Sequence, residues 1–184
     1  MDRFEVQPTP LAGAVLLERK PIADRRGFLE RLYDDGDLAS ILDNRQIRQV
    51  NRTLTGARGA VRGMHFQRAP YADLKIVHCL RGAVFDVVVD LRDGSPTFGQ
   101  WHSVELSGDG HRSFVVPEGF AHGFQTLTEN CEMLYFHTAA YVRDAEGGVS
   151  PFDPALAIDW PLEVTDISDR DRGHPAIGDR FRGL

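Results

Sequence analysis

Lysine is almost absent from this 184-residue chain, and cysteine is equally rare. Lys20 and Lys75 are the only lysines among the 21 basic residues, and Lys75 lies inside an apolar stretch. The two cysteines, Cys79 and Cys131, lie in apolar, strand-like segments, where a free cysteine usually packs as a small buried hydrophobe. No Cys-x-x-Cys spacing is present, so the sequence does not indicate a zinc site built from cysteines.

Long apolar runs and an excess of positive charge are also missing. No apolar run is long enough to cross a bilayer, and residues 1–8 lack the apolar core of a signal peptide. The formal net charge of -6 disfavours a broad surface for nucleic acid or an anionic membrane, although clustered arginines permit a local anion site. We therefore expect a cytoplasmic protein with no nucleic-acid partner and no membrane partner.

The length and the 42% share of hydrophobic residues fit a single domain over residues 1–184. We expect its barrel core at about 45–140. The segment 141–184 should wrap this core as loops and short helical turns, because four prolines there break any long element.

Short segments separated by glycine and proline turns predict an all-β sandwich or barrel. Strands are expected at 11–17, 47–53, 61–66, 75–80, 83–91, 100–106, 113–116, 123–127 and 131–139. The strands at 75–80 and 83–91 resemble a hairpin that turns at Arg81 and Gly82. Helical spacing of apolar residues predicts one short helix at 37–42. Alternation in 47–53 places Gln49 and Asn51 on one side of that strand.

Two segments each present a histidine among glycine and aromatic neighbours. They are 62–67 (Arg-Gly-Met-His-Phe-Gln), which contains His65, and 117–124, which contains His122. A metal-dependent barrel enzyme would need a His-x-His pair, a carboxylate and a distant histidine, since open catalytic sites use about three protein ligands. Here Gln67 takes the place of the second histidine and is a poor substitute for imidazole. This shortfall favours a histidine that acts as a base, and we expect no metal and no cofactor.

Taken in order, the motifs resemble those of the nucleotide-sugar 3,5-epimerases, whose type member is dTDP-4-dehydrorhamnose 3,5-epimerase. The resemblance runs from about Asp24 to Pro175. Its motifs are 24–27, 49–51, 62–67, Lys75, 86–92 with 95–99, 117–124, Tyr135 with Tyr141, 153–154, 159–161 and 168–171. It implies a cupin-like jelly-roll barrel, all-β with short peripheral helices, that forms a homodimer with shared active sites.

Enzymes of this family invert carbons beside the 4-keto group of a nucleotide-diphospho-6-deoxyhexose, removing a proton on one face and returning one on the other. The resemblance implies that His65 is the base, a role that suits a pKa near neutrality, and that Asp171 supports it by a hydrogen bond. Lys75 would stabilise the developing oxyanion, and Tyr135 would return the proton as a phenol. The implied reaction is metal-independent epimerisation at C3, at C5 or at both. The dTDP-linked sugar is the expected substrate, with a CDP-linked counterpart as the alternative.

The resemblance also implies residues that bind the substrate away from the reacting carbons. Arg26 and Arg62 would meet the diphosphate, because guanidinium groups suit phosphate oxygens. Arg26 and its neighbours are expected to reach the active site of the partner subunit, which is why a homodimer is implied. The remaining sugar and polar contacts would come from Gln49, Asn51, His122 and Tyr141.

One motif departs from the family pattern Arg-Gly-x-Phe-x-Glu. The segment 26–31 reads Arg-Gly-Phe-Leu-Glu-Arg, so Arg31 stands where the family has glutamate, and Glu30 comes one residue earlier. In a strand, this shift turns the carboxylate to the opposite face. Cytosine offers acceptors where thymine offers a donor, so Arg31 could read another base, with Phe28 or Tyr33 stacking on it. A loop that returns Glu30 to the site is the alternative.

Three other functions remain open from the sequence. They are a metal-dependent cupin, a nucleotide-sugar 3,4-ketoisomerase and a sugar-binding module without activity. The 62–65 block and Lys75 favour the epimerase over the ketoisomerase, and the four occupied catalytic positions argue against lost activity. The sequence does not determine the nucleotide, the final sugar, or whether one carbon or two are inverted.

Overall fold

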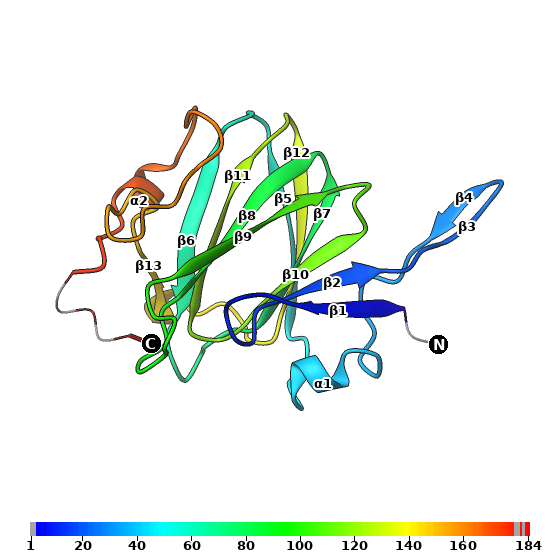
Figure 1. The fold of residues 1–184 in the computed structure, drawn as a ribbon, viewed down its shortest axis with the longest axis horizontal. Helices are drawn as coiled ribbons and strands as arrows, with labels where there is room; N and C mark the ends of the chain where they lie inside the picture. Colours follow the sequence, from blue (N-terminus) through cyan, green and yellow to red (C-terminus); the bar gives the residue numbers. More distant parts are fainter. Residues whose placement is uncertain (1–2, 179–180, 182) are drawn as a thin grey trace.

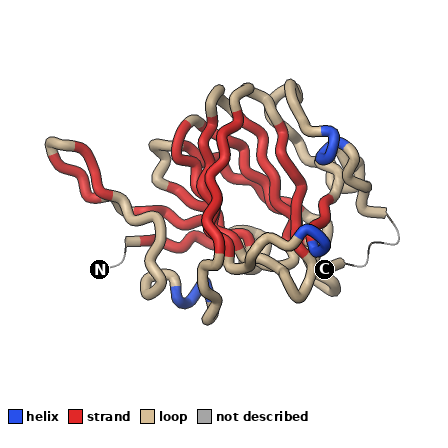
Figure 2. Tube along the Cα trace, turned by 180° about the vertical axis from the view of Figure 1, so that it is seen from behind, coloured by secondary structure: helices blue, strands red, loops and turns tan. Residues whose placement is uncertain are grey.

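Two antiparallel sheets face each other in the computed structural model, which describes residues 3–178, 181, 183 and 184 (Figures 1 and 2). One sheet runs in the order β1 (Phe4–Pro8), β2 (Val15–Arg19), β10 (Arg112–Val116), β7 (Lys75–Arg81), β12 (Cys131–His137) and β5 (Gln49–Thr55). The other runs in the order β13 (Glu146–Gly148), β6 (Val61–Gln67), β11 (Phe120–Thr126), β8 (Ala83–Asp90) and β9 (Trp101–Ser107).

Helical structure is short and peripheral among the described residues. It consists of α1 (Ala39–Leu42), the 3-10 turn η1 (Arg143–Ala145) and α2 (Asp169–Arg172). The predicted all-β class and the predicted helix at 37–42 are therefore confirmed, although α1 starts two residues later than expected. No helix in this part of the chain is both long and apolar enough to span a bilayer.

The prediction that 75–80 and 83–91 form a hairpin is wrong. The strand β7 pairs with β10 and β12 in one sheet, whereas β8 pairs with β11 and β9 in the other. The chain therefore crosses between the sheets at Gly82, which has φ +76 and whose added Cβ would lie 2.8 Å from the Cys131 sulfur. Two strand-forming segments joined by a glycine turn are expected both in a hairpin and where a chain crosses from one sheet to the other. The sequence pattern could therefore not distinguish the two arrangements.

The apolar run in β8 is explained by burial on both faces of its sheet. Val84 and Val88 face the core between the two sheets, while Val87 and Val89 face an outer cluster. That outer cluster includes Leu156, so residues of the C-terminal segment cover the sheet there. A strand buried on both faces needs apolar residues at consecutive positions, which is why 87–89 shows no alternation.

Several strands were not predicted from the sequence. They are β1, β13 and the two strands of an arm, β3 (Ile22–Asp24) and β4 (Gly27–Leu29). The strand expected at 11–17 is observed as β2 and starts only at Val15. The two cysteines are buried free thiols, as predicted. The single-domain organisation over 1–184 stays a prediction.

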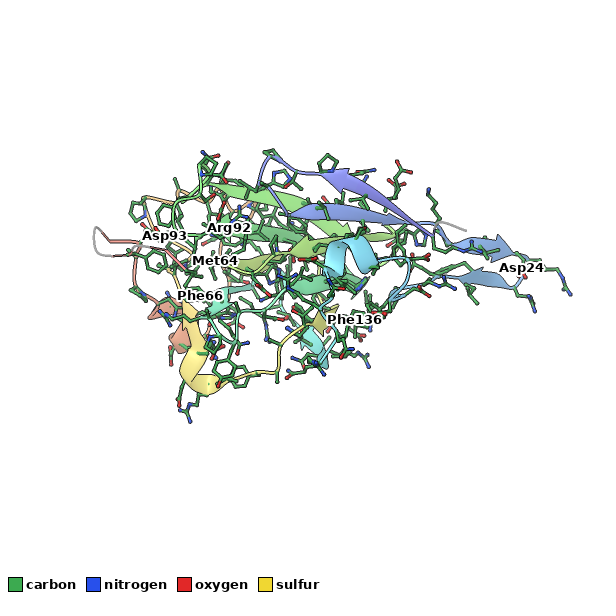
Figure 3. All side chains as sticks on the ribbon, turned by 90° about the horizontal axis from the view of Figure 1, so that it is seen from below. Asp24, Met64, Phe66, Arg92, Asp93 and Phe136 are labelled. Atoms are coloured by element: carbon green, nitrogen blue, oxygen red, sulfur yellow. The ribbon has the colours of Figure 1, made fainter. Side chains whose placement is uncertain are left out.

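The β3–β4 arm stands away from the sandwich (Figure 1), with Asp24 near its far end (Figure 3). Two of its large apolar side chains are solvent-exposed, Phe28 by 60% and Leu29 by 68%. An isolated two-stranded hairpin is at best marginally stable in water, so this arm needs a further surface to pack against.

Candidate active site

A pocket opens between the two sheets, and both sheets contribute polar side chains to it. The six-stranded sheet supplies Gln49, Asn51, Thr53, Lys75, Tyr135 and His137. The five-stranded sheet supplies Arg62, His65, Gln67, His122 and Glu146. Eight of the residues predicted from the sequence therefore line one cavity: Gln49, Asn51, Arg62, His65, Lys75, His122, Tyr135 and Tyr141.

A β-bulge explains how Arg62 and His65 can face the same pocket although they lie three residues apart on one strand. His65 pairs with His122 across β6 and β11, but Arg62 pairs with Phe124, so the register shifts between them. Gly63 makes this possible with φ +132, where an added Cβ would lie 2.6 Å from the Cα of Gly123. A bulge turns the side chains on its two sides to the same face, and only glycine fits here.

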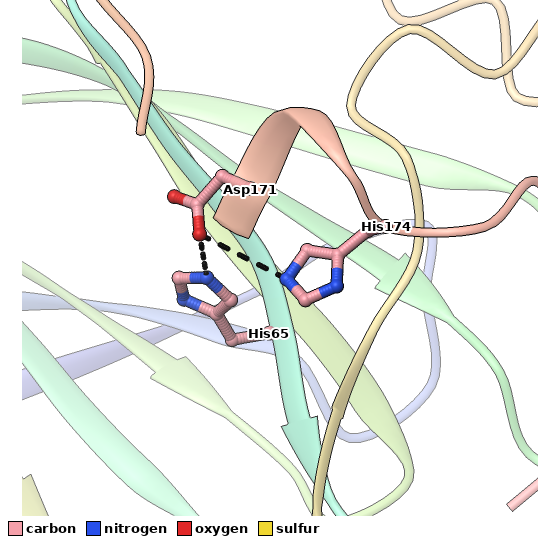
Figure 4. A group of neighbouring side chains, drawn as sticks. All are labelled: His65, Asp171 and His174. Carbon is pink, nitrogen blue, oxygen red and sulfur yellow. Dashed lines mark hydrogen bonds and ion pairs between the residues drawn. The ribbon is translucent and has the colours of Figure 1, made fainter. Parts of the chain in front are cut away.

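His65 is held by Asp171 through a hydrogen bond of 2.8 Å from Nε2 to Oδ1 (Figure 4). The helix α2 positions this carboxylate, because the Ser168 side chain caps the helix by accepting from the Asp171 N–H at 3.1 Å. The other oxygen, Oδ2, accepts from the Gly63 N–H at 3.0 Å. Burial alone would raise the pKa of Asp171, but His65, the Gly63 N–H and the Ser168 side chain lower it to about 2. The carboxylate is therefore ionised and fixes the ring orientation of His65.

A second histidine, His174, packs against this pair (Figure 4). Its ring meets the His65 ring edge-on at 5.5 Å between centroids, and its Nε2 lies 3.8 Å from Asp171 Oδ1. Burial lowers the pKa of His174, and the neighbouring His65 lowers it further. Near neutral pH, His174 is therefore an uncharged ring that shields the hydrogen-bonded pair.

Among the described residues, His65, Asp171 and His174 are the group that could hold a metal ion, with one donor atom each within 4.8 Å of the others. Tetrahedral ligands at roughly 2.0–2.1 Å from an ion lie about 3.3 Å from one another. The 2.8 Å between His65 Nε2 and Asp171 Oδ1 is shorter than that and suits a direct hydrogen bond. The geometry therefore favours a base and its supporting carboxylate over a metal centre.

Lys75 and Tyr135 approach from the sheet opposite His65. Burial lowers the pKa of Lys75, while the carboxylates of Asp73, Asp86 and Glu146 oppose that change. A lysine with a lowered pKa gives up its proton more readily to an oxyanion beside it. Burial raises the pKa of Tyr135 well above its usual value, so its side chain stays a phenol and can donate a proton.

Two further pocket histidines also have an aspartate partner. His122 Nε2 lies 2.9 Å and 3.0 Å from the two oxygens of the buried Asp86. His137 Nδ1 lies 2.6 Å from Asp73 Oδ2. In each pair the carboxylate accepts a hydrogen bond from one ring N–H, which determines the tautomer of the neutral ring and leaves the other nitrogen available.

Hydrogen bonds to the loop at 138–142 fix the wall of the pocket beside Tyr141. Gln49 Oε1 accepts from the Tyr141 N–H at 3.0 Å, and Gln67 Oε1 accepts from the Val142 N–H at 2.7 Å. The Tyr141 hydroxyl donates to Glu146 at 2.9 Å, which raises the pKa of that phenol. Gln67, at the position where a metal cupin has its second histidine, thus binds backbone and shapes the pocket.

Comparison with known proteins decides the family. The model of the dTDP-4-dehydrorhamnose 3,5-epimerase family matches residues 8–179. The chain belongs to this family. It is 44% identical over 166 residues to dTDP-4-dehydrorhamnose 3,5-epimerase from Mycobacterium tuberculosis, covering 88% of this chain and 82% of the relative. The family resemblance seen in the sequence is thereby confirmed, and the chain is an isomerase.

Two solved epimerase structures are similar to this chain in both fold and sequence. One is dTDP-4-dehydrorhamnose 3,5-epimerase from Bacillus anthracis with TDP and PPi bound, with a TM-score of 0.91, 39% identity, and coverage of 95% of this chain and 99% of that one. The other is a doubly substituted 3'-monoepimerase from Streptomyces bikiniensis with dTDP, with a TM-score of 0.85, 31% identity, and coverage of 92% and 86%. This likeness confirms the predicted cupin-like jelly-roll fold.

Three residues that were predicted from the sequence to bind substrate lie outside this chain's own pocket. Arg26 and Phe28 are on the projecting arm, where the Arg26 guanidinium pairs with Asp24. Arg31 pairs with Asp37 at 3.1 Å and with Asp34 at 3.4 Å. Their contribution to substrate binding stays a prediction.

Glu30 does not return to the pocket of its own chain. It accepts from His111 Nδ1 at 2.7 Å and lies 2.9 Å from Nε of the buried Arg19. Tyr33, a candidate for stacking on the base, instead stacks on Phe136 at 5.4 Å between centroids. The one-residue shift in the 26–31 motif thus gives Glu30 a structural partner at the base of the arm.

Several residues that line or support this epimerase site were not predicted from the sequence as site residues: Thr53, Asp73, Asp86, His137, Glu146 and His174. A signal existed for His137, because it lies two residues after Tyr135 on one strand and so faces the same side. No local signal existed for Asp73 or His174, which lie outside the strands.

Proposed function

We propose that the chain inverts C3 and C5 of dTDP-4-keto-6-deoxy-D-glucose without a metal. One observation carries the proposal: His65, supported by Asp171, and the phenol of Tyr135 line one pocket from opposite sheets. A base and an acid on opposite sides of a sugar ring can remove a proton from one face and return one to the other.

The proposed steps assign one role to each group. The Nδ1 of His65 takes the proton beside the ketone, and Asp171 stabilises the imidazolium that forms. Lys75 stabilises the negative charge on the C4 oxygen of the enolate. Tyr135 then protonates the carbon from the other side. In the Streptomyces bikiniensis variant, a histidine was replaced by asparagine and a tyrosine by phenylalanine, with the same separation along that chain as His65 and Tyr135 have here.

The choice of dTDP rests on the relatives, of which one was solved with TDP and another with dTDP. A CDP-linked sugar is the second candidate, because Arg31 replaces the family glutamate. Its guanidinium already pairs with two aspartates, so reading cytosine would require it to leave them. This pairing favours the dTDP-linked substrate.

Proton NMR in heavy water tests this proposal directly. Matched dTDP- and CDP-linked 4-keto-6-deoxyglucose are incubated with wild-type enzyme, and deuterium is followed at both carbons. We expect incorporation at C3 and C5 with strong dTDP preference, and none with His65→Asn. Deuterium at C3 alone would make the chain a monoepimerase, and preference for CDP would assign Arg31 to the base.

We further propose that the enzyme is a homodimer in which each arm completes the pocket of the other subunit. The exposed Phe28 and Leu29 support this, since the arm leaves them in solvent in a single subunit. Arg26 would then meet the diphosphate of the partner's substrate. The cytoplasmic location expected from the sequence stays a prediction.

Subunit complementation tests the shared site. Arg26→Ala and His65→Asn variants are each expected to be inactive, and mixing them after dissociation should restore up to about a quarter of wild-type activity. This follows if half of the subunits pair as heterodimers and each heterodimer carries one intact site. Two inactive variants that stay inactive when mixed, although they form mixed dimers, would show that each site uses its own arm.

A further inference from the structure

The pair of His137 and Asp73 lies in the pocket but has no role in the reaction steps above. The carboxylate is firmly placed, because Oδ1 accepts from the N–H groups of Thr138 and Ala139 at 3.0 Å and 3.2 Å. Its Oδ2 accepts from His137 Nδ1 at 2.6 Å. The His137 side chain is 16% exposed, so the ring is largely buried but reaches the pocket.

This hydrogen bond determines what the other ring nitrogen can do. With the proton of the neutral ring on Nδ1, Nε2 carries a lone pair and accepts hydrogen bonds. Its contact among the described residues is the Asn51 amide nitrogen at 3.4 Å, which is long for a hydrogen bond. A better donor that enters the pocket can therefore take this acceptor.

The neighbours of His137 on its own and adjacent strands include residues that are assigned to the sugar. It pairs across the strands with Lys75 on β7 and with Gln49 on β5. Its ring stacks on Tyr135, with 6.0 Å between centroids and 24° between the planes. The groups assigned to the ketone oxygen and to the reprotonated carbon are thus its direct neighbours, which places His137 beside the hexose.

We propose that His137 is a further substrate-binding residue, and that its Nε2 accepts a hydrogen bond from a hydroxyl group of the hexose. The inference rests on the proposed function for the kind of ligand. Lys75 has only donors and suits the ketone oxygen, whereas His137 offers an acceptor and suits a hydroxyl. Asp73 makes this division possible because it holds the proton on Nδ1.

Calorimetric binding of two ligands tests the proposal. The probes are dTDP, which lacks the hexose, and dTDP-glucose, which carries the hydroxyls but no ketone and does not react. His137→Phe removes the acceptor and keeps the ring that stacks on Tyr135. We expect dTDP to bind within twofold of wild type and dTDP-glucose to bind about 3- to 10-fold more weakly, the loss of one hydrogen bond.

A matched control is His102→Phe, since His102 lies on β9 outside the pocket and should leave both affinities unchanged. Equal losses for dTDP and dTDP-glucose would overturn the proposal, because they would assign His137 to the diphosphate or to folding. Unchanged affinity for both would overturn it as well. Failure of the proposed function differs from these results, because wild-type enzyme would then turn over none of the 4-keto sugars.

Asp73→Asn provides an independent variant. The oxygen of the introduced amide must face the two backbone N–H groups, so its nitrogen faces His137 and moves the ring proton to Nε2. Nitrogen NMR of the labelled ring should show this change, together with weaker binding of dTDP-glucose than of dTDP. A ring that keeps its proton on Nδ1 in Asp73→Asn would contradict the role given to Asp73.

Discussion

Replacing Asp171 with asparagine should inactivate the enzyme by moving one proton. The buried Gly63 N–H needs an acceptor at the place of Oδ2, so the asparagine oxygen is expected to stay there. The amide nitrogen then takes the place of Oδ1, 2.8 Å from His65 Nε2. Nε2 must become an acceptor, which puts the ring proton on Nδ1, the nitrogen that should take the proton from carbon.

The pKa of Asp171 shows how strongly its surroundings favour the ionised carboxylate. The pKa of Asp171 falls from 3.8 to about 2 despite its burial, which corresponds to roughly 2 kcal/mol favouring the carboxylate at 1.36 kcal/mol per pKa unit. Burial opposes this decrease, and His65 is the largest contributor to it. Because Asp171→Asn removes this carboxylate and leaves His65 with the wrong tautomer, we expect kcat to fall on the order of 10³-fold, within the range for acid–base groups.

The assay measures the rate of deuterium incorporation at C3 under substrate saturation, and thermal unfolding of the same samples. Asp169→Asn is the matched control, because Asp169 lies in the same turn of helix but is exposed. The variant should keep its nucleotide affinity and unfold within a few degrees of wild type. If Asp171→Asn retained more than a fifth of wild-type exchange, the reasoning on the base would be refuted.

Three further predictions follow from the fold and the site. Tyr135→Phe should lower formation of the inverted product about 10²-fold or more while His65 still exchanges the substrate proton, and equal losses in both would remove Tyr135 as the acid. Burial and the nearby Arg19 lower the pKa of His78 from 6.5 to about 3, so below pH 6.5 only the unfolded chain takes up this proton. The free energy of unfolding should therefore fall by up to about 1.4 kcal/mol for each pH unit as the pH is lowered from 6.5 to 3. Urea titrations at several pH values should show that it depends less steeply on pH in His78→Gln. Gly63→Ala should destabilise the fold by about 2–4 kcal/mol through positive φ and a backbone clash, well beyond Gly94→Ala, where φ is +68 and nothing lies near the added Cβ.

The fold class, the family and most of the pocket could be predicted from the order of residues alone. The motifs around His65, Lys75 and Tyr135 each lie on a strand, and strand periodicity fixes which neighbours share a face. That periodicity correctly grouped Gln49 with Asn51. Such information is local, since it depends only on residues a few positions apart.

Contacts between distant residues, by contrast, depend on the folded chain. Asp171 reaches His65 only because a capped turn of helix packs against β6, and the 106 positions between them carry no geometric information. The crossing at Gly82 between the two sheets follows from the pairing of whole strands, which a glycine turn does not specify. The shared face of Arg62 and His65 follows from a bulge that breaks strand periodicity. These features come from packing and register, which local patterns cannot encode.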